Sequence, residues 1–266
     1  MGKFIHIIPI GLEKDRNIHL LQKFPPFRVY FLDYKSNTKD EQKYSHLTEK
    51  IKKELDSLIT LAEKIYLNVS YENFEESFLS IFEIMVKEKK EGNEVIAHVV
   101  SGPRLTSFAA WIAASITHSK AYYIRPAQYL PEGENLISKG FLKEIELFHF
   151  PVTIPSEHGL IVLEHLLEHQ GSMTGSLRYF VDELDILKLG KIKSKNSAIV
   201  KMSYCFRELK RDNYVIISRV SKKRQKIVLT DLGKLVAKAY KIMKNHDYKV
   251  KNSNGNEDLN TNTSHE

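Results

Sequence analysis

The amino-acid sequence predicts an α/β protein in which a domain with a parallel sheet precedes a smaller, mainly helical domain. Three observations lead to this expectation. Short apolar runs alternate with stretches of helical spacing through the first 125 residues. From Ser156 onward the order changes to three helical stretches, two β-like runs and a closing helix. The charge balance also changes along the chain, from acidic to strongly basic.

The first domain is predicted from its alternating strands and helices. Apolar runs predict strands at Lys3–Ile10, Phe27–Asp33, Lys64–Ser70, Glu94–Val100 and Ala121–Arg125. Apolar residues spaced three and four apart predict helices at Leu47–Leu61, Phe74–Met85 and Leu105–Ile116. Strands and helices in this order form right-handed βαβ crossovers, so we expect a Rossmann-like parallel sheet with helices on both faces.

The domain boundary is predicted near Pro155. Glu144–Val152 reads as a late strand of the first domain, and Pro155 follows it. We therefore assign residues 1–154 to the Rossmann-like domain and residues 155–245 to the second domain. The remaining residues, 246–266, are predicted to form a disordered tail, because nearly all of this segment is polar and of low complexity.

The second domain has the element order of a winged helix-turn-helix. Helices are expected at Ser156–His169, Thr174–Leu187 and Ser194–Arg211. Tyr214–Ser218 and Lys226–Leu229 read as a two-stranded hairpin, and a last helix starts at Thr230-Asp231 and runs through Met243. A winged helix of this kind places one helix in the major groove of DNA and its hairpin along the backbone.

The charge distribution favours double-stranded DNA as the partner of this domain. Residues 191–250 hold 17 Lys and Arg against 4 Asp and Glu, which is +13, and residues 251–266 carry −2. Since the whole chain is +7, residues 1–190 carry 7 − 13 + 2 = −4. The alternatives are a solvated cationic surface and a surface for another protein. The predicted DNA-binding residues are Lys195, Asn196, Lys201, Ser203, Arg207, Lys210, Lys222, Lys223 and Arg224.

Several other classes are disfavoured by composition. No apolar run is long enough to cross a bilayer, and the N-terminal segment lacks the pattern of a signal peptide, so we expect a cytoplasmic protein without membrane contact. Cys205 is the only cysteine and forms neither an intrachain disulfide nor a cysteine-based zinc site. His165, Glu168 and His169 match the H-x-x-E-H pattern, but no further Glu ligand is evident. We interpret them as helix surface and expect no metal.

A ligand site is predicted where the fourth strand turns into a helix. The turn Ser101-Gly102-Pro103-Arg104 would aim free N–H groups at an anion above the sheet edge. The loop after the first strand would lie beside it. The sequence contains neither the G-x-G-x-x-G fingerprint nor a P-loop, and the alternative is an ordinary turn in which Ser101 or Thr106 caps the helix. The predicted site residues are Gly11, Leu12, Arg16, Ser101, Gly102, Pro103, Arg104, Thr106 and Arg125.

Three segments resemble a known family. IPIGLEKDRN, VVSGPRLTSFAAWIAA and AYYIRPAQY are similar to archaeal transcription regulators in which a CARF domain, the CRISPR-associated Rossmann fold, precedes a winged helix. Arg104 falls at the basic position of the family's motif, whereas His98 and Val100 stand where Asn or Asp and Ser or Thr are usual.

The resemblance implies a homodimer that binds cyclic tetra-adenylate or a related nucleotide and passes the signal to the DNA-binding domains. We therefore expect a regulator rather than an enzyme, with no cofactor beyond this ligand. Two alternatives stay open. One is a weak ring nuclease that would use Ser101, Arg104 and Arg16 to cleave the ring. The other is a nucleotide sensor that acts through protein contacts.

Overall fold

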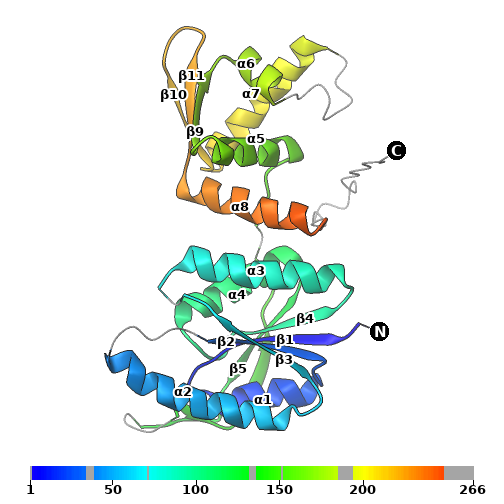
Figure 1. The fold of residues 1–266 in the computed structure, drawn as a ribbon, viewed down its shortest axis with the longest axis vertical. Coiled ribbons are helices and arrows are strands. Elements are labelled where there is room, and N and C mark those ends of the chain that lie inside the picture. The colour runs from blue at the N-terminus through cyan, green and yellow to red at the C-terminus, as the bar shows by residue number, and fades with distance from the viewer. Residues whose placement is uncertain are drawn as a thin grey trace. The chain divides into compact units, whose positions relative to one another are not determined.

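The computed structural model describes residues 2–33, 39–70, 72–131, 136–150, 152–184 and 194–248. The chain folds into two compact units (Figure 1). The first unit contains residues 1–152 together with 246–250, and the second contains residues 153–245. Most of the tail predicted over 246–266 lies outside the described residues. Residues 246–248 are described, and the Tyr248 hydroxyl donates a hydrogen bond of 3.1 Å to the Thr117 carbonyl in the first unit.

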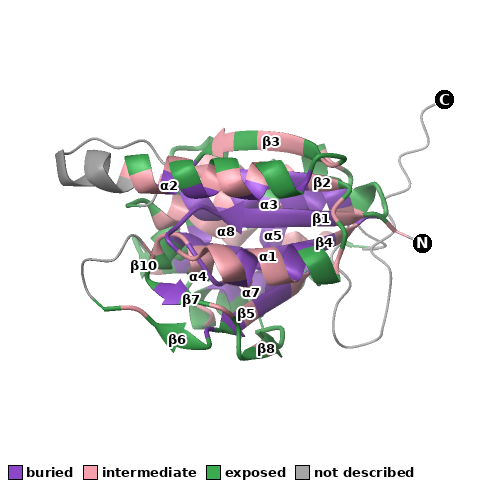
Figure 2. Ribbon diagram, turned by 90° about the horizontal axis from the view of Figure 1, so that it is seen from below, coloured by how far each residue is buried: buried purple, intermediate pink, exposed green. Residues whose placement is uncertain are grey.

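A six-stranded, mostly parallel sheet forms the centre of the first unit. Its strand order is β3-β2-β1-β4-β5-β8, and only β8 runs antiparallel to its neighbour. In the central register, Ile5 pairs with Arg28 on one side and with Val95 on the other. The strands span Phe4–Pro9 (β1), Arg28–Asp33 (β2), Glu63–Asn68 (β3), Glu94–His98 (β4), Lys120–Arg125 (β5) and Lys143–Glu146 (β8). The predicted parallel sheet is thus confirmed, and its central strands are buried (Figure 2).

Helices cover both faces of this sheet, as the alternating pattern predicts. Figure 1 shows α3 (Phe74–Lys90) and α4 (Arg104–Thr117) on one face, and α1 (Lys14–Lys23) and α2 (Lys39–Leu58) on the other. Large apolar side chains fill the layers between them, and Phe31, Phe82 and Met85 are fully buried. Each such side chain contributes roughly 1.5–3 kcal/mol when it leaves water.

Three details of the first unit differ from the sequence expectation. The segment Lys14–Lys23 forms α1 although its first turn is charged and polar. The helix expected to reach Leu61 ends at Leu58. Leu61 is 100% exposed, so it is not part of the buried face of the helix although its spacing fits that face. A small hairpin, β6 (Gln128–Tyr129) with β7 (Ser138–Lys139), follows β5 and was not predicted, because two-residue strands leave no periodic signal.

Over its described residues, the second unit combines four helices with a three-stranded antiparallel sheet. Its elements are α5 (Glu157–Glu168), β9 (Ser172–Gly175), α6 (Leu177–Glu183), α7 (Lys195–Arg211), β10 (Val215–Arg219), β11 (Gln225–Leu229) and α8 (Asp231–Asn245). The sheet has the order β10-β11-β9. The helix predicted to start at Thr174 is therefore wrong at its beginning, because Thr174 pairs with Lys226 in the sheet. Its predicted end at Leu187 lies outside the described residues.

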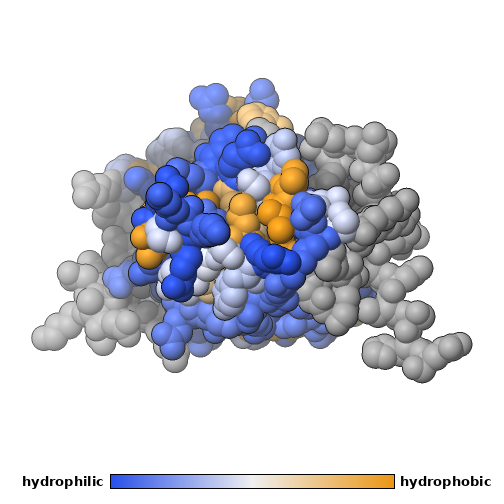
Figure 3. Space-filling view, turned by 90° about the horizontal axis from the view of Figure 1, so that it is seen from above, coloured by the Kyte–Doolittle hydropathy of each residue, from blue (hydrophilic) through white to orange (hydrophobic). Residues whose placement is uncertain are grey.

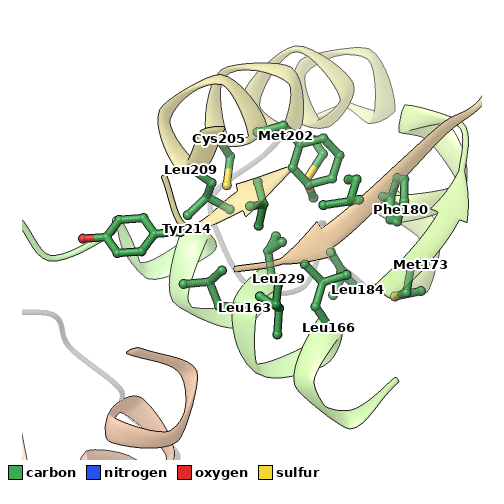
Figure 4. Packing of buried hydrophobic residues seen from close by; sticks show 14 of the residues in the cluster. Leu163, Leu166, Met173, Phe180, Leu184, Met202, Cys205, Leu209, Tyr214 and Leu229 are labelled. Carbon is green, nitrogen blue, oxygen red and sulfur yellow. The ribbon is translucent and has the colours of Figure 1, made fainter. Parts of the chain in front are cut away.

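One apolar cluster holds the second unit together (Figure 4). α5 contributes Leu163 and Leu166, α6 contributes Phe180, and α7 contributes Met202 and Leu209, each at most 2% exposed. Ser176 is the N-cap residue of α6, and Ser194 is the N-cap residue of α7. The hydroxyl of each accepts a hydrogen bond of 3.2 Å from a backbone amide. Because α7 buries one stripe of side chains, its opposite face is left for contact with solvent or a partner.

Candidate ligand site and nucleic-acid interface

The sheet of the first unit has a topological switch point between β1 and β4. From β1 the chain proceeds to β2 and β3 on one side, and β4 and β5 lie on the other. The loops that leave the carboxyl ends of β1 and β4 diverge here, which is where ligands bind in open α/β sheets. The two segments singled out from the sequence, Gly11–Arg16 and Ser101–Arg104, follow these two strands.

The two loops pack backbone against backbone. Gly102 has a φ of +80°, in the left-handed region that favours glycine, and a Cβ there would lie 2.6 Å from the Cβ of Pro9. A side chain at Gly11 would overlap the backbone amide of Gly102. Both glycines are therefore required for this close approach, which brings the predicted site residues of the two loops together.

Beneath the turn lies a buried chain of polar side chains. The Ser101 hydroxyl donates to the Pro9 carbonyl at 2.6 Å and accepts from Nδ2 of Asn17 at 2.9 Å. Asn17 also donates to the Glu13 carbonyl at 2.7 Å, which fixes the orientation of its amide. Its Oδ1 then faces Nδ1 of His98 at 2.8 Å. Ser101 is thus part of the foundation of the turn and does not cap α4, contrary to one reading of the sequence.

This chain continues through a second histidine. The contacts from His98 Nε2 to His6 Nδ1 and from His6 Nε2 to the Phe24 carbonyl are each 2.8 Å. The oxygens at the two ends, on Asn17 and Phe24, can only accept, so the three contacts require three ring protons. Two neutral imidazoles supply only two. The pair must therefore either carry a positive charge or leave one hydrogen bond unmade.

Burial decides this balance in favour of the neutral pair. Loss of solvent lowers the pKa of His6 to about 4, and the bond to the Phe24 carbonyl only partly opposes this. The pKa of His98 is lowered well below its usual value by burial and by the proximity of His6. At neutral pH both rings are therefore neutral, and one of the three hydrogen bonds in this chain is missing.

The first turn of α4 offers unpaired polar groups next to this foundation. Pro103 is the N-cap residue, and it supplies no side-chain hydrogen bond to the helix. Thr106 is 1% exposed, and its hydroxyl has no hydrogen-bond partner among the described residues. Thr106 therefore does not cap α4 either. The free N–H groups and the positive end of the helix dipole can receive an anion at this point.

The three predicted cations of this site have different surroundings. Arg104 is exposed at the start of α4, and Arg125 is exposed at the end of β5. Arg16 is 4% exposed, and its guanidinium contacts the Glu13 carboxylate at 2.7 Å and the Ile124 carbonyl at 3.1 Å. Burial raises the pKa of Glu13, and Arg16 opposes that shift. Arg16 therefore forms an ion pair inside the protein, whereas Arg104 is exposed and can contact a ligand.

The side chain of Leu12 belongs to the core. It is 9% exposed and packs with Ile8, Ile10 and Phe31 beneath α2. Only the Leu12 backbone is near the loop surface, where its carbonyl accepts from the Ile137 amide at 3.4 Å. Leu12 therefore positions the loop and is not a ligand contact through its side chain.

In the second unit, a basic groove lies between the helices and the β10–β11 hairpin. It encloses about 600 Å³. Leu177, Ile199 and Ile217 provide its apolar lining, and the face seen in Figure 3 likewise has hydrophobic atoms at its centre with hydrophilic atoms around them. Five cations line the groove: Arg178, Arg219, Lys222, Lys223 and Arg224.

α7 lines this groove through Ile199, and the predicted DNA-binding residues of α7 lie outside the groove lining. Among the predicted DNA-binding residues, Asn196, Lys201, Arg207 and Lys210 are exposed, and Ser203 is half-buried. Lys195 differs, because its ammonium contacts Asp182 of α6 at 2.5 Å. The predicted cations at the hairpin tip, Lys222, Lys223 and Arg224, are all exposed and line the groove.

Four residues of this surface were missed from the sequence. Arg178 and Arg219 line the groove, but neither has a basic neighbour on either side in the sequence. Val200 is 55% and Tyr204 58% exposed on α7, and the Arg207 guanidinium lies 4.3 Å from the Tyr204 ring centroid. Apolar side chains on an otherwise polar helix face can contact thymine methyl groups in a major groove.

The sequence is similar to one family model over its first half and to one archaeal protein over most of its length. Residues 4–129 match the family model described as HFX_2341_N:-like, N-terminal. An uncharacterized protein of Archaeoglobus fulgidus is 25% identical over 236 residues, which is 88% of this chain and 97% of that protein.

Two solved structures are similar at lower identity. Can2 from Sulfobacillus thermosulfidooxidans in complex with cyclic tetra-adenylate is 14% identical, with a TM-score of 0.33 over 89% of this chain and 64% of Can2. Enterococcus italicus Csm6 bound to cyclic hexa-2'-fluoro-hexa-dAMP is 12% identical, with a TM-score of 0.39 over 80% of this chain and 56% of Csm6. This chain therefore spans less than two thirds of either structure.

Among the described helices, none combines the length and apolarity needed to span a membrane.

Proposed function

We propose that this protein is a transcription regulator that binds double-stranded DNA and responds to a nucleotide ligand. The observation that carries the proposal is the basic groove beside α7. Its five cations are positioned by α6 and by the β10–β11 hairpin, and α7, whose Ile199 lines the groove, exposes Asn196 and Arg207. Cations of this kind bind phosphates, and amide or guanidinium groups bind base edges.

The second unit acts in this proposal as a winged helix-turn-helix. The order α5, α6, α7 followed by the β10–β11 hairpin supports that assignment, with β9 as the short strand that closes the sheet. α7 would be the recognition helix in the major groove. The hairpin would be the wing, and the cations at its tip would follow the phosphate backbone or enter the minor groove.

The first unit acts as the CARF-type sensor. The uncapped first turn of α4, the orphaned Thr106 hydroxyl and the exposed Arg104 lie together at the switch point of the sheet. These groups suit the phosphate of a nucleotide. Given the sequence resemblance, we propose a cyclic oligoadenylate, and cyclic tetra-adenylate, the ligand in the Can2 complex, is the first compound to test.

We also propose that the protein is a homodimer through α4 and the segment after β8. Three phenylalanines there are exposed, Phe108 by 51%, Phe148 by 78% and Phe150 by 53%. Trp111 joins them, because its indole nitrogen donates to the Phe148 carbonyl at 3.1 Å and its ring meets Phe150 edge-on. An apolar surface of this kind is typical of a protein interface. Phe108→Glu should shift the mass measured by light scattering from dimer to monomer.

We propose that the ligand is bound and not cleaved. Of the residues considered for ring cleavage, Ser101 donates its proton to the Pro9 carbonyl and Arg16 faces Glu13. Among these three residues, none is therefore left to act as the general base that ring cleavage needs. Labelled cyclic tetra-adenylate incubated with the protein should be recovered intact, and linear product in excess of a protein-free control would favour a ring nuclease.

DNA binding with and without ligand tests the function. Fluorescence anisotropy of labelled DNA from upstream of the gene should give binding that changes when cyclic tetra-adenylate is added. Arg178→Glu should weaken DNA binding and keep ligand binding, whereas Arg104→Glu should abolish only the response to the ligand. Lys241→Glu on α8 is the matched control, because it reverses an exposed cation outside the groove. Equal affinity of the Arg178→Glu and control proteins would argue against the groove as the DNA site.

A further inference from the structure

Three side chains that can ligate a metal meet where α5 and α6 end. His165 lies in the last turn of α5, and His169, the C-cap residue, follows it four positions later and so lies on the same side of the helix end. Glu183 is the last residue of α6. One ligand atom from each of these residues lies within 4.8 Å of the other two. The sequence shows the two histidines but not the carboxylate, which the fold brings in from 14 residues beyond His169.

The two imidazoles are already arranged as metal ligands usually are. Nδ1 of His169 donates to the His165 carbonyl at 2.9 Å, which fixes its tautomer and leaves Nε2 free. A backbone carbonyl is a common outer partner of a metal-bound histidine. Nε2 of His165 is buried without a hydrogen-bond partner among the described residues. The ring centroids lie 4.2 Å apart, and one nitrogen of each ring lies within 4.8 Å of the other.

The third ligand can approach the two imidazole rings. The side chain of Glu183 is exposed and can rotate toward the rings. Four ligands at about 2.0–2.2 Å from a zinc ion lie roughly 3.4 Å from one another, so small side-chain rotations close the present separation.

We propose that His165, His169 and Glu183 bind a divalent transition-metal ion of the zinc class, with a water molecule as fourth ligand. Two nitrogens and one carboxylate oxygen suit Zn²⁺, whereas Mg²⁺ and Ca²⁺ require oxygen ligands. The ion would tie the end of α5 to the end of α6. Since α6 precedes α7 along the chain, the metal would stabilise the part of the unit that carries the candidate DNA-binding helix.

Metal binding by the full-length, untagged protein tests this site. Calorimetry with ZnCl₂ and metal analysis after dialysis should give one ion per chain. Co²⁺ should give the visible absorption of a tetrahedral nitrogen–oxygen site. Removing an outer partner of a metal ligand typically costs about 10–100-fold in affinity, so His165→Asn, His169→Asn and Glu183→Gln should each cost at least that much.

Two control variants separate this site from adventitious binding. His118→Asn removes one member of another histidine pair, whose Nδ1 atoms lie 3.3 Å apart in the first unit. Glu168→Gln removes the acid inside the H-x-x-E-H pattern and leaves Glu183 in place. Both controls should bind Zn²⁺ as the unmodified protein does. Unchanged affinity in Glu183→Gln, loss of binding in a control, or no stoichiometric binding at all would overturn the proposal. Because Glu183 is exposed, its variant should fold normally, so its result is interpretable even if a histidine variant does not fold.

Discussion

Lowering the pH from 7 to 5 should destabilise the first unit through His6. Its folded-state pKa of about 4 lies below the value of 6.5 for an unperturbed histidine. A histidine with a lowered folded-state pKa binds fewer protons in the native state, so its contribution to stability is complete above pH 6.5 and falls as the pH drops toward 4. Each unit of pKa difference corresponds to about 1.4 kcal/mol, which gives a loss of about 2 kcal/mol at pH 5.

The chain provides its own probe for this experiment. Trp111 is the only tryptophan and lies in α4, so urea unfolding followed by its fluorescence reports on the first unit. The reference is the double variant His6→Gln/His98→Gln, whose amides do not titrate but can still form hydrogen bonds. Because the variant also removes His98, whose pKa is lowered as well, the unmodified protein should lose at least about 2 kcal/mol more than this variant between pH 7 and pH 5. Equal losses in the two proteins would show that the histidine pair does not take up protons between pH 7 and pH 5. They would mean that the pair keeps a proton at pH 7 and that the count of three hydrogen bonds outweighs desolvation.

Three further predictions concern single positions. Gly102→Ala should lower the unfolding free energy measured through Trp111 by at least about 2 kcal/mol, because its φ of +80° and the contact with Pro9 both oppose a side chain; an unchanged urea midpoint would contradict this. Ser194→Ala should lower the stability of the second unit by about 1 kcal/mol in thermal unfolding, whereas Ser194→Gly should cost only a few tenths; equal effects would exclude a capping role. Burial raises the pKa of Cys205 to about 12. A thiol reagent at pH 8 should therefore label the native protein roughly a thousandfold more slowly than the unfolded chain. Rapid labelling of the native protein would show that α7 is not packed as described.

The strands of the first unit were predictable because buried parallel strands appear as continuous apolar runs. β1 and β4 are examples: nearly all of their residues are buried on both faces of the sheet. α1 was missed because two of its four buried residues are Arg16 and Asn17, which pack through hydrogen bonds and ion pairs instead of apolar contact. Hydrophobic periodicity cannot detect a helix of that kind.

The candidate sites were only partly predictable for a related reason. Gly11, Gly102 and Arg104 could be proposed from the local patterns of two loops, because turn chemistry depends on neighbouring residues. The contact between His6 and His98 joins positions 92 residues apart, and only the pairing of β1 with β4 brings them together. The same holds for Glu183 beside the histidines of α5. Long-range side-chain networks depend on the tertiary fold and leave no signal at a fixed spacing.

The salt dependence of DNA affinity shows whether the basic groove binds DNA. The measurement compares the unmodified protein with the variant Lys222→Ala/Lys223→Ala/Arg224→Ala on the same upstream DNA over a range of KCl concentrations. Each phosphate contact contributes about −0.9 to the slope of log K against log salt, so we expect a slope that is shallower by about 3 in the variant. Cyclic tetra-adenylate should shift the affinity of both proteins without restoring the slope. Identical slopes for the two proteins would show that these three cations do not contact DNA.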